Sequence, residues 1–194
     1  MSQPQHGNAT HRALQTLVIV LLFLIFVVPS VGHAVDGNRR GFVAGAGLGY
    51  SPVANWIRSP GDVHVTERAF AIDVIIGHGW DSRNMIVYEG LPTLRKSNYL
   101  YDSPVVQGLN GVRWYHFWDK QGRRVYSAVG LGLMAISSKY SNYTGNGFGY
   151  CFGVGCDAVK HVQIGLFYIG GSTKSNGVTL YHNLLSLLVT ALAY

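Results

Sequence analysis

Three charged residues stand on what would be one face of neighbouring apolar runs. Asp73 alternates with apolar residues in its run, Glu89 does so in the next run, and Arg113 follows in a third. If the apolar side chains of these runs face outward, the two carboxylates and the guanidinium face inward. Opposite charges on three consecutive segments of one interior predict a buried ion cluster.

Such a cluster has two interpretations. It is a path for protons or ions, or it is a structural plug that satisfies charges inside a filled interior. The same inner faces are rich in glycine, which leaves little room for water, and this favours the plug. The parity that turns Arg113 inward also places Asn110 on the outward face, among apolar side chains.

The elements that must position these residues are about eight strand-like runs separated by turn-rich segments. In the first run, Phe42, Leu48 and Tyr50 share one face while glycines share the other. No segment beyond residue 34 carries an amphipathic helical pattern of usable length, so the spacing predicts an all-β, eight-stranded antiparallel up-and-down barrel. The runs span 41–50, 68–80, 84–91, 105–118, 125–136, 147–156, 162–169 and 182–194.

The connections between these runs alternate in length. Long polar connections are expected at 51–67, 92–104, 137–146 and 170–181, and short turns at 81–83, 119–124 and 157–161. Short periplasmic turns alternating with longer external loops are typical of barrels that span the bacterial outer membrane. Both ends of the barrel domain would then lie on the periplasmic side.

The closing run, which ends at Tyr194, is apolar on both parities. Counting back from that aromatic residue, we expect an outward set in contact with lipid. The expected outward residues are Leu184, Ser186, Leu188, Thr190 and Leu192. A soluble lipocalin-like or avidin-like barrel is the alternative, but its outer faces would be polar, whereas these are built from Phe, Leu, Val, Ile and Tyr.

The N-terminal segment has the features of a secretory signal. Residues 17–28 form an uninterrupted apolar run, followed by Pro29 and by small residues at Gly32 and Ala34. This pattern predicts cleavage after Ala34, which leaves 35–194 as one barrel domain. An uncleaved anchor helix is the alternative, and Pro29 and the small-residue site argue against it.

Charge and side-chain chemistry exclude several other classes. The net charge is +6, but the basic residues are scattered, which argues against a nucleic-acid partner. Cys151 and Cys156 are expected to be separate packing residues, since five positions along a strand place them on opposite faces, although an oxidising periplasm would permit a bridge if the strand broke between them. The histidines show no ligand-like spacing, so neither a metal nor a cofactor is expected. Aromatic residues near strand ends predict girdles at the head groups: Trp80, Trp114, Trp118, Tyr126, Tyr168 and Tyr194.

Three stretches together resemble the small outer-membrane barrels related to OmpX, OmpW and the OmpA membrane domain. They are the glycine-alternating run at 41–50, the sequence at 110–117 with the tight turn that follows it, and the terminal residues 187–194. The resemblance implies a location in the cell outer membrane, contact with its lipid and lipopolysaccharide, and recognition by the barrel-assembly machinery through the strand that ends at Tyr194. It does not fix a function, because this fold serves adhesins, narrow channels, anchors and lipid-modifying enzymes.

The resemblance also suggests where an enzyme of this class would hold its catalytic groups. Lipid A palmitoyl transfer would use the outer rim, where His64, Asp102 and Ser103 are the candidates. Lipid A deacylation would need a histidine two residues before a serine on a late strand, and Ser172 has none. The favoured interpretation is a non-enzymatic barrel with a structural or interaction role through its external loops and an envelope or extracellular partner. A narrow channel for small solutes is a third possibility.

We predict processing after Ala34, because the apolar run and the small residues at 32 and 34 meet the requirements of signal peptidase. Intact-mass measurement of protein extracted from membranes tests this. A mature species that retains residues 1–34 would contradict it.

Overall fold

The computed structural model describes residues 40–59, 63–98, 103–118, 125–138, 143–175 and 177–194. The proposed signal segment and its cleavage site lie outside these residues. All regular structure in the described part is β-strand, and no helix there is long and apolar enough to cross a membrane. The strands are β1 (Gly41–Ser59), β2 (Val63–Gly79), β3 (Asn84–Ser97), β4 (Ser103–Phe117), β5 (Val125–Ser138), β6 (Tyr143–Val159), β7 (Val162–Ser175) and β8 (Val178–Ala193).

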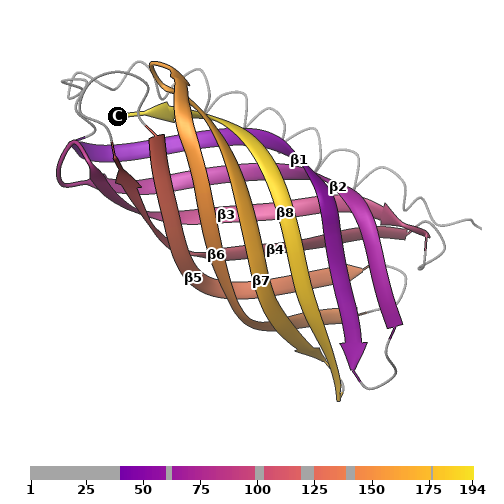
Figure 1. The fold of residues 1–194 in the computed structure, drawn as a ribbon. Coiled ribbons are helices and arrows are strands. Elements are labelled where there is room, and N and C mark those ends of the chain that lie inside the picture. Colours follow the sequence, from indigo (N-terminus) through magenta and orange to yellow (C-terminus); the bar gives the residue numbers. More distant parts are fainter. Residues whose placement is uncertain (1–39, 60–62, 99–102, 119–124, 139–142, 176) are drawn as a thin grey trace, which may run out of the picture.

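The eight strands form one closed antiparallel barrel, as the sequence predicts. Each strand pairs with its neighbours in the chain, and β1 pairs with β8 to complete the ring. Figure 1 shows the strands inclined to the long axis of the barrel. Closure leaves no sheet edge along the barrel wall, which is the condition for backbone that lies in hydrocarbon.

The strands are longer at their outer ends than the sequence predicts. Most residues of the four expected long connections belong to strands. For example, residues 92–97 belong to β3 and residues 170–175 belong to β7. The prediction of long external loops was wrong because it followed apolar alternation. In β3, Thr93, Arg95 and Ser97 keep the inward parity although they are polar. β1 has 19 residues, about twice what crossing a bilayer requires, so its outer part continues beyond the hydrocarbon.

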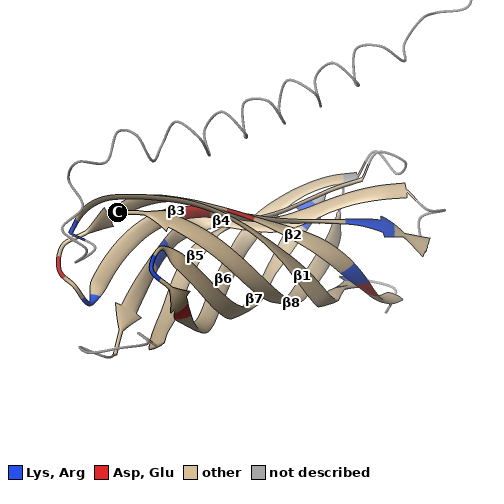
Figure 2. Cartoon of the chain, turned by 90° about the horizontal axis from the view of Figure 1, so that it is seen from above, with Lys and Arg blue, Asp and Glu red and all other residues tan. Residues whose placement is uncertain are grey.

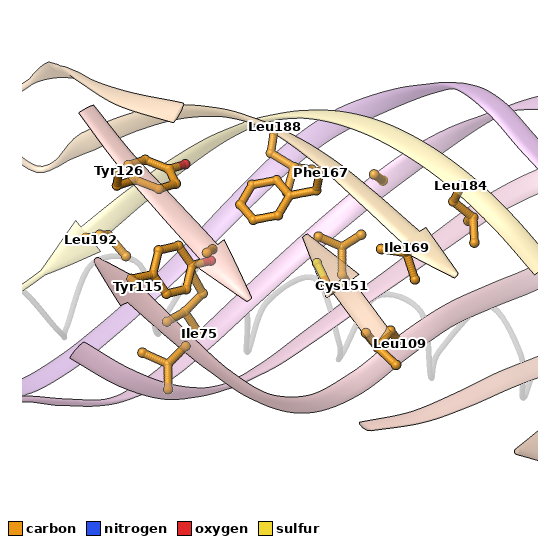
Figure 3. Close-up of a cluster of buried hydrophobic side chains, with 14 of the residues drawn as sticks. Ile75, Leu109, Tyr115, Tyr126, Cys151, Phe167, Ile169, Leu184, Leu188 and Leu192 are labelled. Carbon is orange, nitrogen blue, oxygen red and sulfur yellow. The ribbon is translucent and has the colours of Figure 1, made fainter. Parts of the chain in front are cut away.

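Alternation along each strand separates a filled interior from an apolar exterior. Leu109, Met134 and Ile169 are fully buried inside, whereas Leu131 and Phe152 are 60% and 56% exposed outside. Figure 3 shows the inward side chains meeting across the interior. Figure 2 shows that many charged residues lie toward the two ends of the barrel. Asp73, Glu89 and Arg113, which lie nearer the middle, are buried inside. Such an exterior is suited to a lipid surround.

The face assignment of β8 is opposite to the sequence prediction. The five residues expected to face lipid are all buried: Leu184, Ser186, Leu188, Thr190 and Leu192. Leu187 and Val189 are half exposed on the outside instead. A run that is apolar on both parities does not indicate which of its faces turns inward. Contacts with the neighbouring strand determine this.

The inward-facing glycines of β1 determine which face of β8 turns inward. A Cβ atom at Gly45 would lie 2.4 Å from Leu192 Cδ2, and one at Gly49 would lie 2.5 Å from Leu188 Cδ2. The leucines of β8 therefore fill space that only glycine leaves open. The two strands fit together as small against large, which fixes both the facing and the register.

We expect Leu131→Arg to lower the free energy of unfolding by about 2–4 kcal/mol, because it puts a charge near the middle of the lipid-facing wall. Ser59→Arg, at the exposed outer end of β1, is the matched control and should change it by less than about 0.5 kcal/mol. Urea unfolding in lipid vesicles measures both. Equal losses at the two sites would refute the assignment of the outer face.

Candidate functional site

The centre of the barrel holds a buried ion pair between β3 and β4. Arg113 Nη1 donates a hydrogen bond to Glu89 Oε1, and the Tyr115 hydroxyl donates to Glu89 Oε2 at 2.5 Å. All three side chains are buried. The Arg113 guanidinium also lies over the ring of Phe167, with its carbon 5.5 Å from the ring centroid. Both carboxylate oxygens are thus satisfied, as a charge in a low-dielectric interior requires.

Glycines on the adjoining strands create the room for this pair. Arg113 is paired with Gly130 of β5, where a Cβ atom would lie 2.5 Å from Arg113 Cγ. Glu89 is paired with Gly111 of β4. The glycine-rich inner faces seen in the sequence are therefore the spaces into which the long charged side chains fold.

Asp73 lies inside as expected but has a different partner. Its Oδ2 atom accepts a hydrogen bond from Thr190 Oγ1 at 2.7 Å, and its Oδ1 atom has no partner within the described residues. The three charges predicted as one cluster are thus a bonded pair, Arg113 and Glu89, and a carboxylate held by β8. Sequence reasoning missed Thr190 because it had turned β8 outward.

A second polar cluster occupies the outer end of the interior. Glu67 accepts hydrogen bonds from Arg95 Nε at 2.8 Å, from Ser97 Oγ at 2.9 Å and from the backbone N–H of Asn98 at 2.8 Å. The backbone pairing of β2 with β3 reaches outward only to Phe70, so Glu67 joins the two strands beyond that point. This cluster went unpredicted because its segments had been assigned to loops.

The outer cluster leaves donors without partners. Arg95 Nη1 and Nη2 are buried and have no hydrogen-bond partner in the described part of the chain. Across the same interior, His182 Nε2 lies 2.8 Å from Thr173 Oγ1. Buried polar groups of this kind are usually satisfied by water.

The three residues considered for acyl transfer do not form a site among the described residues. His64 is exposed on the outer face of β2, whereas Ser103 is buried on the inner face of β4. The barrel wall therefore separates the candidate base from the candidate nucleophile, and Ser103 Oγ has no hydrogen-bond partner among the residues that the structure describes. Asp102 lies outside the described residues. A hydroxyl without a base in reach is a weak nucleophile.

Four of the six aromatic residues proposed for a girdle face outward. They are Trp80, Trp114, Trp118 and Tyr168, each between 38% and 65% exposed. At the inner end of the barrel, Trp114 Nε1 donates to Asn84 Oδ1, and Trp118 Nε1 donates to Ser127 Oγ, each at 3.2 Å. These rings, with His116 between them, line a shallow groove of about 340 Å³ at the level expected for head groups.

Tyr126 and Tyr194 do not belong to a girdle, and that part of the prediction was wrong. Tyr126 is 2% exposed and packs inside against Tyr115 and Phe117, with ring centroids 5.4 and 5.5 Å apart. Tyr194 is 6% exposed, with its ring centroid 4.7 Å from that of His161. Tyr126 follows the inward parity of β5, and Tyr194, one residue beyond the end of β8, continues the inward parity of that strand. Closeness to a strand end does not reveal this parity.

The remaining sequence candidates have simple placements. Cys151 is buried on the inner face of β6, and Cys156 is half-buried further along the same strand. Both are free thiols. Among the described residues, no three side chains of metal-ligating type gather in one place.

We expect Arg113→Met to lower the free energy of unfolding by about 3–5 kcal/mol, because it leaves the Glu89 carboxylate buried without its cation. Combining it with Glu89→Gln should recover much of that loss, since the neutral amide can still accept the Tyr115 hydrogen bond. Arg58→Met, at an exposed position, is the control. Denaturant unfolding measures all three variants, and a double variant no more stable than the single one would contradict the ion-pair assignment.

Comparison with known proteins identifies the architecture. No protein-family model and no curated protein matches the sequence. Among solved structures, the barrel is similar to Neisserial surface protein A, with 18% identity, a TM-score of 0.55, and coverage of 78% of this chain and 96% of that one. It is also similar to Ail, the attachment invasion locus protein of Yersinia pestis, with 11% identity, a TM-score of 0.50, and coverage of 78% and 99%. At these identities the likeness concerns the fold, and this protein has the fold of the small eight-stranded outer-membrane β-barrels.

Proposed function

We propose that this protein is a non-enzymatic outer-membrane barrel with a structural or interaction role at its outer end. The observation that carries the proposal is the filled interior. Arg113, Tyr115, Phe117, Leu109 and Met134 are all buried to 1% exposure or less, and Arg113 is paired with Glu89. A lumen packed in this way supports the plug interpretation over a channel, because ions need a continuous wet path.

The outer end supports an interaction with anionic groups of the outer leaflet. Arg58, Arg68, Lys96 and Lys174 are exposed on four different strands near their outer ends. Arg68 lies one outward-facing position further toward the outer end than the apolar Phe70 on the outer face of β2. Lys96 lies in the same way beyond Leu94 on the outer face of β3. Basic side chains just beyond an apolar band suit the phosphates of lipopolysaccharide. The strand extensions, rather than long loops alone, would present this surface.

No observation on the described residues supports the enzymatic alternative in the way that the filled interior supports the structural role. His64 and Ser103 lie on opposite faces of the wall, so neither can activate the other. Structural neighbours named for surface location and for attachment and invasion fit an interaction role better than catalysis.

The proposal predicts that the lipid A acylation pattern does not depend on this protein. Lipid A mass spectra should be the same in cells that lack the protein, overproduce it or carry Ser103→Ala, since Ser103 has no base in reach among the described residues. The purified protein should give no single-channel conductance in planar bilayers. A gain or loss of one acyl chain that follows Ser103, or resolved channel openings, would overturn the proposal.

Copurification of lipopolysaccharide tests the basic rim, which consists of the exposed Arg58, Arg68, Lys96 and Lys174. Replacing Arg68, Lys96 and Lys174 with Gln should reduce the lipopolysaccharide that copurifies with the barrel, because three charges at the outer boundary are removed. Lys160→Gln, at the exposed inner turn, is the control and should leave the amount unchanged. Equal retention by both variants would refute the rim as the contact surface.

A further inference from the structure

Asn110 is a carboxamide on the lipid-facing wall, far from either end of the barrel. Its side chain is exposed on the outer face of β4, beside Gly90 of β3 and Leu133 of β5. Gly90 lies midway between Asn84, at the inner end of β3, and Lys96, at its outer end. The amide is therefore near the middle of the apolar band.

The hydrogen-bonding groups of this amide are exposed on the lipid-facing side of the wall. No other group in the described part of the chain forms a hydrogen bond with it, although it offers two N–H donors and an acceptor. Acyl chains offer neither donors nor acceptors, so the position costs free energy unless a partner supplies them. Polar residues at this depth that face lipid are rare for the same reason.

The surface around Asn110 is low and uncharged. Its neighbours on the outer face of β3 and β4 include Gly90 and Gly108, which have no side chain, and Pro92, whose side chain is a compact ring. A Cβ atom at Gly90 would lie 2.9 Å from Asn110 Oδ1, so a larger residue there would crowd the amide. Val106, Val112 and Leu133 surround this patch and are exposed. Tyr88 and Leu133 stand above it at 55% and 67% exposure, so the low part of the surface lies beside Gly90, Pro92 and Gly108, where a second copy can approach the amide.

We propose that the outer face of β3 and β4 around Asn110 binds a second copy of this chain within the membrane. A carboxamide is complementary to itself, since each Asn110 can donate an Nδ2–H hydrogen bond to the Oδ1 atom of the other. A two-fold axis that passes beside Asn110 and runs along the membrane normal brings the same patch from both copies together. The patch carries no charged side chain, so no like-charge repulsion opposes the contact. β3 and β4 are adjacent in the wall (Figure 1).

Cysteine cross-linking in native outer membranes tests the contact directly. In a Cys156→Ser background, Asn110→Cys should form a disulfide-linked dimer on mild oxidation, because the two-fold axis places the pair in contact. Leu187→Cys is the matched control: it is half exposed at mid-wall on β8, far around the barrel from β4. It should remain monomeric under the same conditions. Cys151 is buried in the interior and should not react.

Association in lipid vesicles tests the role of the amide. Dimerisation measured by energy transfer between labelled full-length copies should weaken by about tenfold in Asn110→Leu, which loses both hydrogen bonds. Asn110→Gln, which keeps the amide, should retain part of the association. Because leucine suits a lipid-facing wall, Asn110→Leu should fold at least as well as the wild type, as shown by its resistance to SDS before boiling.

Three outcomes would overturn the proposal. They are cross-linking at Asn110→Cys no stronger than at Leu187→Cys, wild-type association in Asn110→Leu, and cross-linking of Asn110→Cys to a different membrane protein.

Discussion

Closure of the barrel through the pairing of β1 with β8 is the constraint on which the rest of the structure depends. In hydrocarbon an unpaired N–H or C=O group has no water to bind, so the first and last strands must meet along their length. They pair from Ala44 with Ala193 to Ser59 with Thr179. The glycines of β1 receive the leucines of β8, so the same contact also determines which face of β8 turns inward. An apolar final strand is thus as much a core element as a lipid-facing one.

The interior follows from closure. Eight strands leave space that inward side chains must fill, and here glycine alternates with large residues so that the layers fit together. Arg113 and Glu89 fit into this packing because glycines on β4 and β5 make room for them and because each neutralises the other. A second polar group around Glu67 and Arg95 joins β2 to β3 where their backbone pairing ends. The lumen is therefore built as a core, which leaves the surfaces of the wall for any interaction.

The exterior is divided into zones that match the membrane. Trp114 and Trp118 lie at the inner end, apolar side chains cover the middle, and Lys96 and Arg68 mark the outer end. Each zone meets a different solvent: head groups with mixed polarity, acyl chains, and the charged outer surface. Asn110 is the residue that breaks this order, since it places an amide where the surround offers no hydrogen bond. An interface between copies would restore the match.

The sequence by itself determined the number of strands, their order and the inward facing of Asp73, Glu89 and Arg113, because apolar alternation is a local property of each strand. It also placed Asn110 outside, where the structure has it. Only the tertiary structure decided the facing of β8, the interior positions of Tyr126 and Tyr194, the partner of Asp73, and the extent of the strands beyond the bilayer. Each of these depends on a neighbour across the sheet. A run that is apolar on both faces, or polar beyond the membrane, carries no local signal of parity, so its orientation is set by the register and by the space that the adjoining glycines leave open.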